Sequence, residues 1–153
     1  MSYFNLKGQS SVEYLSVIAI ALMVLIPGSY LFLNYSKSTT EQVSANQLNL
    51  AGNEIINEAE KMYVLGKNSW VTLEISLPGM FLDAGIFEGE ELFFNYSTSV
   101  GDSTTVFFPM GFNISNSTSS PCAPSTLCSL DLTPGINRVR IQSQGDFVSI
   151  RKI

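Results

Sequence analysis

The fold of this chain is decided by a long apolar segment near the N-terminus, residues 12–33, which read VEYLSVIAIALMVLIPGSYLFL. A helix crosses the hydrocarbon core of a bilayer with about 20 consecutive, mostly apolar residues. The segment therefore has the length and composition of a membrane-spanning helix. Its one charged residue is Glu13. An acid inside a membrane segment usually has a partner, but near the end of the span it can also reach water, so both interpretations of Glu13 stay open.

The residues before this segment form a short polar leader, MSYFNLKG, in which Lys7 is the one positively charged side chain. In an ordinary secretory signal, the small residues of the cleavage site follow the apolar region. Here the small residue, Gly8, comes first, and no A-x-A sequence closes the apolar region. Cleavage after Gly8 would keep the helix on the mature protein. It would also free an amino group at Gln9, a suitable cation for Glu13.

Residues 7–15, KGQSSVEYL, resemble the class III signal peptide of archaeal type IV pilin-like proteins. Gln9, Ser11 and Glu13 match the pattern of that family, and Val17 stands where the family has Leu. The resemblance implies that a prepilin peptidase cuts between Gly8 and Gln9. It also implies that Glu13 contacts the N-terminal amine of an adjacent subunit during assembly. The matching motif covers only the N-terminal part of the chain.

The resemblance further implies a structural role. The expected protein is a subunit of a type IV pilus-like surface filament, built through its N-terminal helix and serving adhesion. It would lie in the cytoplasmic membrane before assembly, and its head domain would be extracellular. Its partners would be prepilin peptidase, the pilus assembly machinery, and further copies of itself or other pilins. The alternative is a membrane-anchored cell-surface binding protein that uses the same signal peptide and stays in the bilayer.

Beyond the apolar segment the sequence predicts more helix. Pro27, followed by Gly28, predicts a kink or local melting, because proline lacks the N–H that a helix needs. The polar residues 34–47 are poor helix formers in isolation, and whether they are helical stays open. Gly66 then predicts the end of the helix. Apolar residues before it recur at helical spacing: Leu48, Ile55, Ala59 and Met62, with Ile56 and Tyr63 beside them.

From Trp70 the period changes to alternation, which is typical of half-buried strands. We expect strands at 70–77, 92–97, 104–108, 112–115, 129–132, 137–143 and 147–153. The acidic segment 83–91 lacks calcium-loop spacing and is interpreted as a solvated turn. The predicted fold class is α+β, a long N-terminal α-helix followed by a small antiparallel β-sandwich or rolled sheet. The expected division is a leader at 1–8, the helix at 9–66 and a β-rich extracellular head at 67–153.

The composition argues against an enzyme. The sequence has no histidine, which removes the commonest general base and metal ligand. It also has no recognisable catalytic or phosphate-binding motif, so we expect neither catalysis nor a cofactor or metal. Its net charge is −5. A nucleic-acid partner is not expected, because the basic residues near the C-terminus are spread along strands, as on a solvated sheet face: Arg138, Arg140, Arg151 and Lys152.

Two kinds of covalent modification are predicted. Cys122 and Cys128 flank a short polar loop and would form a local disulfide outside a reducing compartment; two free thiols are the alternative. The chain also has four Asn-x-Ser/Thr sequences, which are candidate N-glycosylation sites in an exported protein. They begin at Asn34, Asn95, Asn113 and Asn116.

Overall fold

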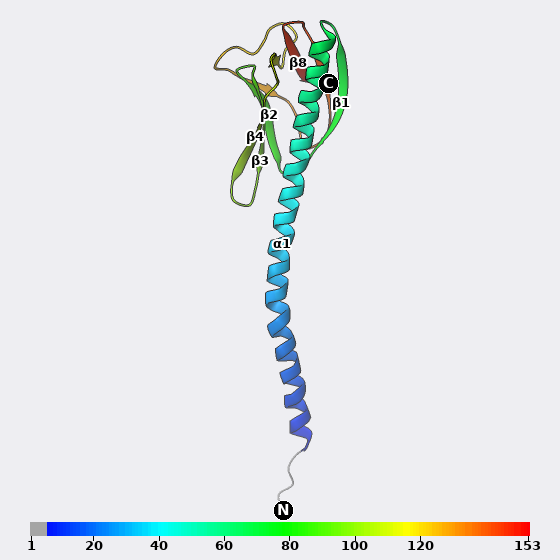
Figure 1. Ribbon diagram of the computed structural model, residues 1–153. Coiled ribbons are helices and arrows are strands. Elements are labelled where there is room, and N and C mark those ends of the chain that lie inside the picture. The colour runs from blue at the N-terminus through cyan, green and yellow to red at the C-terminus, as the bar shows by residue number, and fades with distance from the viewer. Residues whose placement is uncertain (1–5) are drawn as a thin grey trace, which may run out of the picture. The chain divides into compact units, whose positions relative to one another are not determined.

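A computed structural model describes residues 6–153, with side chains described from Val12 onward. The chain is α+β, with one long N-terminal helix followed by two four-stranded sheets (Figure 1). It divides into two compact units, Met1–Glu41 and Gln42–Ile153, which are described separately below. Residues 1–5 of the expected leader lie outside the described residues. The elements are α1 (Leu6–Leu65), β1 (Trp70–Leu77), β2 (Phe81–Phe87), β3 (Glu91–Ser97), β4 (Asp102–Phe107), β5 (Asn113–Ser115), β6 (Leu127–Leu130), β7 (Gly135–Ser143) and β8 (Phe147–Lys152).

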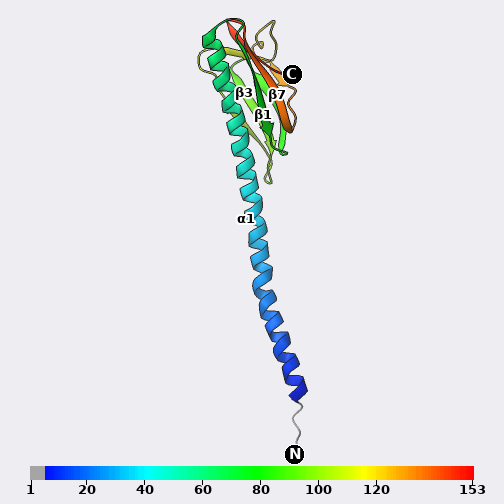
Figure 2. The same cartoon turned by 90° about the vertical axis from the view of Figure 1, so that its right-hand side faces the viewer.

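The first unit contains the early part of α1. Figure 2 shows α1 as one continuous helix, and Pro27 lies inside its bounds, so of the kink or local melting expected there, local melting does not occur. A proline removes one backbone hydrogen bond, and the turns on both sides remain intact. The helix also includes residues 34–47, whose state the sequence left open. Two hydroxyl groups in this stretch are satisfied within the helix: Thr39 Oγ1 donates to the Tyr35 carbonyl at 3.0 Å, and Thr40 Oγ1 donates to that of Ser36 at 2.9 Å.

The last part of α1 belongs to the second unit and supplies one side of its core. Leu48, Ile55 and Ala59 are completely buried, as their helical spacing predicted. The helix ends at Leu65, where Gly66 adopts the left-handed conformation at φ 92°. The Gly66 N–H donates to the Met62 and Tyr63 carbonyls at 3.2 and 3.1 Å. This geometry is a helix C-cap, so the predicted end of the helix is confirmed.

The two sheets have the strand orders β1-β7-β8-β5 and β4-β3-β2-β6, which we call sheet A and sheet B. All their strand pairs are antiparallel except β5 with β8, which is parallel. In Figure 1 the strands of sheet B lie on one side of α1 and β1 lies on the other. One continuous hydrophobic core joins the helix and both sheets; its completely buried members from the sheets include Ile86, Leu92, Phe94, Ile114, Ile141, Val148 and Ile150.

One strand of sheet B was missed by the sequence interpretation. The predicted acidic turn at 83–91 contains most of β2, and only Glu88, Gly89 and Glu90 form the turn to β3. The pairing register shifts between Phe81 and Asp83, so that two consecutive residues, Leu82 and Asp83, are exposed. A bulge of this kind breaks the alternation by which a strand is recognised. The other predicted strands are confirmed, with small shifts at their ends.

Candidate functional site: the apolar surface of α1

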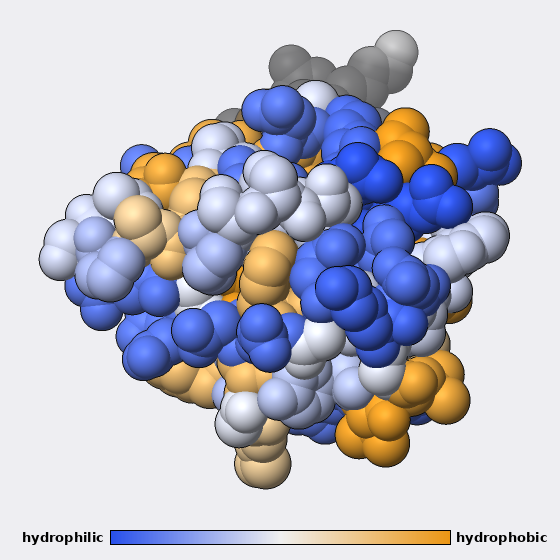
Figure 3. Space-filling view, turned by 90° about the horizontal axis from the view of Figure 1, so that it is seen from above, coloured by the Kyte–Doolittle hydropathy of each residue, from blue (hydrophilic) through white to orange (hydrophobic). Residues whose placement is uncertain are grey.

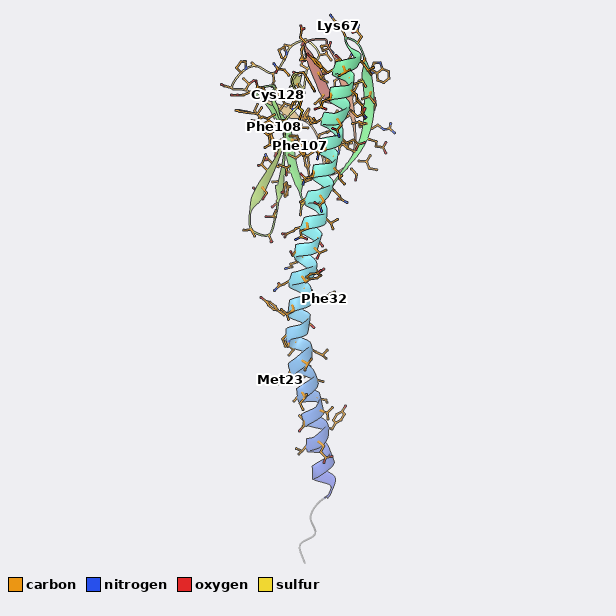
Figure 4. All side chains as sticks on the ribbon, in the orientation of Figure 1. Met23, Phe32, Lys67, Phe107, Phe108 and Cys128 are labelled. Carbon is orange, nitrogen blue, oxygen red and sulfur yellow. A yellow bond between two sulfur atoms is a disulfide. The ribbon has the colours of Figure 1, made fainter. Side chains whose placement is uncertain are left out.

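The candidate site is the surface of α1 over residues 12–33. Ten consecutive residues, 17–26, are apolar. With 3.6 residues per turn, such a run places apolar side chains on every side of the helix. These side chains are exposed rather than packed: Met23 is 77% exposed and Phe32 is 70% exposed (Figure 4). Among the described residues, α1 is the one helix long and apolar enough to cross a membrane.

The hydroxyl groups of two serines within this surface are satisfied by the helix itself. The hydroxyl of Ser16 donates to the Val12 carbonyl and that of Ser29 to the Leu25 carbonyl, both at 2.8 Å. A hydroxyl bonded in this way adds little polarity to the helix surface. Ser16, with the small residues Ala19 and Ala21, would allow another helix to approach closely. The surface can therefore face lipid or pack against similar helices.

Glu13 lies at the start of this surface. Its side chain is exposed, and it has no ion-pair partner among the side chains described from Val12 onward. The backbone of Gly8 and Gln9 belongs to α1, but their side chains lie outside the described residues. The expected cleavage site and the contact between Gln9 and Glu13 therefore stay predictions.

The face of the second unit that is seen from above is of a different kind. Figure 3 shows mostly hydrophilic residues, with hydrophobic ones in small separate groups. Lys67, directly after the end of α1, lies at this face (Figure 4). Scattered apolar residues of this type are normal on a water-exposed surface. Within the described part of the chain, no three His, Cys, Asp or Glu side chains are grouped so as to hold a metal.

The two cysteines are bonded to each other in the structure. Their Cα atoms are 6.3 Å apart, and the bond closes the polar loop that precedes β6. Cys122 is buried, and Cys128 in β6 pairs with Ile86 of β2 (Figure 4). The loop between β5 and β6 is therefore fastened to the edge of sheet B.

The four candidate glycosylation sites differ in accessibility. Asn113 in β5 and Asn116 just after it are exposed, and Asn116 Nδ2 donates to the Ser129 carbonyl at 3.1 Å. Asn34 is exposed on α1, directly after the apolar segment. Asn95 in β3 is half-buried, and its Oδ1 accepts a 2.6 Å hydrogen bond from Thr104 Oγ1. Within the second unit, Asn113 and Asn116 are therefore more accessible to a glycan than Asn95.

The sequence interpretation missed one feature of sheet A. It treated the basic residues of β7 and β8 as a solvated face, whereas the strand register places Arg140 directly opposite Arg151. The alternation in both strands, together with the hairpin turn around Gly145, was the signal that could have revealed this pair.

No protein-family model matches the chain, and comparisons with curated proteins and with solved structures also found no match.

Proposed function

We propose that this chain is a structural subunit of a type IV pilus-like surface filament, assembled through its N-terminal helix. The observation that carries the proposal is the exposed apolar surface of residues 12–33, which surrounds the helix. Burying one large apolar side chain contributes about 1.5–3 kcal/mol. A surface with so many of them is not stable in water, so it requires either lipid or other helices of the same kind. The resemblance of residues 7–15 to a class III signal peptide favours a protein that uses both in turn.

In this proposal the helix first lies in the cytoplasmic membrane. Prepilin peptidase removes residues 1–8, and the pilus assembly machinery then transfers the helix from lipid into the filament. Glu13 of each incoming subunit contacts the new amine of Gln9 on a neighbour. In a surrounding of low polarity an unpaired carboxylate is costly and a charge-assisted hydrogen bond is strong. The pair would therefore favour one register of neighbouring helices over others.

The head in this proposal is residues 67–153, with the two sheets as the layers of an antiparallel sandwich or rolled sheet outside the cell. The mostly hydrophilic face seen in Figure 3 suits that environment. The filament contains copies of this chain, alone or with other pilins, and serves adhesion. Such a role is mechanical and requires no catalysis, cofactor or nucleic acid.

Immunogold electron microscopy with an antibody against residues 67–153 tests this proposal on intact cells. We expect labelling along filaments that extend from the surface. A strain that lacks the chain is the control, and its filaments should carry no label. Labelling spread evenly over the cell envelope, with none on filaments, would contradict the proposal and favour the anchored binding protein.

A further inference from the structure

The outer face of sheet A holds two arginines side by side. Arg140 in β7 pairs with Arg151 in β8 in the antiparallel register. Side chains directly opposed in such a pair lie on the same face, with their Cβ atoms about 5 Å apart, and like charges in these positions repel each other. The backbone pairing of the two strands therefore keeps both arginine side chains on one face of the sheet, on neighbouring strands.

Neither guanidinium group has an acidic partner within the described residues. The Nε atoms of Arg140 and Arg151 are shielded from solvent and have no hydrogen-bond acceptor. Arg140 lies over the ring of Trp70 in β1, 4.2 Å from the ring centroid, which orients it. The neighbouring arginine of β7 is different, because Arg138 Nε donates to Glu74 at 3.2 Å. The sheet thus supplies a carboxylate for Arg138 but none for the pair.

A small polar pocket lies beside Arg151, and one acidic residue, Asp131, is among its lining residues. The pocket has a volume of about 120 Å³ and is lined by Arg151, Lys152 and Asn116, with Ser129, Leu130 and Asp131. An arginine has five N–H donors in a planar fork that matches the two oxygens of a carboxylate. The Nε atoms of Arg140 and Arg151 are shielded, so carboxylates from outside the chain would bind the terminal N–H groups of the two arginines.

Matching carboxylates lie on another part of the same unit. Glu88 and Glu90 are exposed on the turn between β2 and β3, in sheet B, and neither is in an ion pair within the described residues. The turn is fixed: Glu88 and Gly89 adopt left-handed conformations at φ 54° and 77°. The Gly89 carbonyl also accepts a 2.7 Å hydrogen bond from the N–H of Ile114. A fixed turn that presents two acids is complementary in charge to the Arg140–Arg151 pair.

We propose that the Arg140–Arg151 pair of one copy binds the Glu88 and Glu90 carboxylates of a second copy in the filament. The inference rests on the proposed function and adds a contact between heads to the contact between helices. Charge complementarity and the absence of an acidic partner for either arginine within the described residues favour this occupant. Because two different surfaces meet, the contact is heterologous, and it can repeat from copy to copy without closing. That is the kind of contact an extending filament needs.

Charge reversal in the full-length chain tests the inference in cells, with the yield of sheared filaments as the measurement. R140E/R151E and E88K/E90K should each lower the yield about tenfold or more, because like charges then face each other across the contact. Combining all four substitutions should restore most of the yield. The control K61E/K67E reverses two positive charges of the second unit outside the contact and should leave the yield unchanged. A milder variant, R140Q/R151Q, removes the charge without creating repulsion and should make filaments dissociate at lower salt.

Two results would overturn the inference while leaving the proposed function intact. One is a wild-type filament yield and salt resistance for R140E/R151E and R140Q/R151Q. The other is a loss in both reversed variants that the combined variant does not restore, because the arginines would then bind something other than the turn. Absence of the chain from wild-type filaments would instead contradict the proposed function itself.

Discussion

The ring of Phe107 in β4 lies directly on the backbone of Gly52 in α1. A Cβ atom added to Gly52 would be 2.2 Å from two carbons of that ring, far inside van der Waals contact. Phe107 is itself held by Phe94, with ring centroids 5.6 Å apart in an edge-on arrangement. Glycine inside a helix costs about 1 kcal/mol relative to alanine. Here it allows sheet B to approach the helix closely.

Replacing Gly52 with alanine should destabilise the second unit. Alanine improves helix propensity, but the added methyl group must displace a packed aromatic ring, and overpacking of this kind costs about 1–3 kcal/mol. The measurement is thermal unfolding of the full chain in detergent micelles. Gly28→Ala is the matched control, since nothing lies within 4 Å of a Cβ at that helical glycine. An unfolding temperature for Gly52→Ala at or above that of the wild type would contradict the close packing.

Removing the disulfide should also lower stability. The bond between Cys122 and Cys128 closes a short loop, and constraining a loop of that size in the unfolded chain contributes about 2 kcal/mol. The double variant Cys122→Ser/Cys128→Ser and reduced wild type should therefore unfold at similar, lower denaturant concentrations. Adding reductant to the double variant is the control and should have no effect. Equal stability of oxidised and reduced wild type would refute this prediction.

Glycan occupancy should follow accessibility in the folded unit. We expect sugar on Asn113 or Asn116, which are exposed, and none on Asn95, which is half-buried and bonded to Thr104. Asn34 should be free of sugar as well, because a glycan directly beside the apolar segment would obstruct helix packing. Glycopeptide mass spectrometry of the protein from its native cells measures all four positions. Occupancy of Asn95 together with bare Asn113 and Asn116 would contradict this order.

Neutralising Glu13 should affect assembly alone. Glu13→Gln keeps the size of the side chain but removes the charge that is proposed to bind the Gln9 amine. Since a hydrogen bond to a charged group contributes about 1.5–3 kcal/mol, the filament yield should fall about tenfold or more. Membrane insertion and trimming at Gln9 should be unchanged. Glu54→Gln, an exposed glutamate later on the same helix, is the control, and a normal filament yield from Glu13→Gln would remove the proposed role.

The sequence predicted those parts of the fold in which local pattern and burial agree. Leu48, Ile55 and Ala59 follow the helical period and are buried; Val139 and Ile141 follow the strand period and are also buried. The alternation of apolar and polar residues did not identify β2. A bulge exposes Leu82 and Asp83 in succession there, and Gly85 has no side chain to contribute to the alternation. Helicity through 34–47 could not be predicted from propensity either, because the helix continues from stable turns on both sides.

The candidate site was predictable only in part. The sequence alone shows that residues 12–33 have the length and composition of a helix that could cross a membrane. The pairing of Arg140 with Arg151 depends on the strand register, which the alternation and the hairpin turn around Gly145 indicate but do not fix residue by residue. The partner of Glu13 would come from another molecule, so a single chain does not contain it.

The most direct test of the filament proposal is mass spectrometry of the N-terminal peptide of this protein in filaments sheared from cells. We predict a peptide that begins at Gln9, which would establish both cleavage after Gly8 and incorporation into the filament. Absence of the chain from sheared filaments, with the Gln9 peptide found only in membranes, would contradict filament assembly. A chain that retains residues 1–8, or one cut after the apolar segment, would contradict the processing on which the account depends.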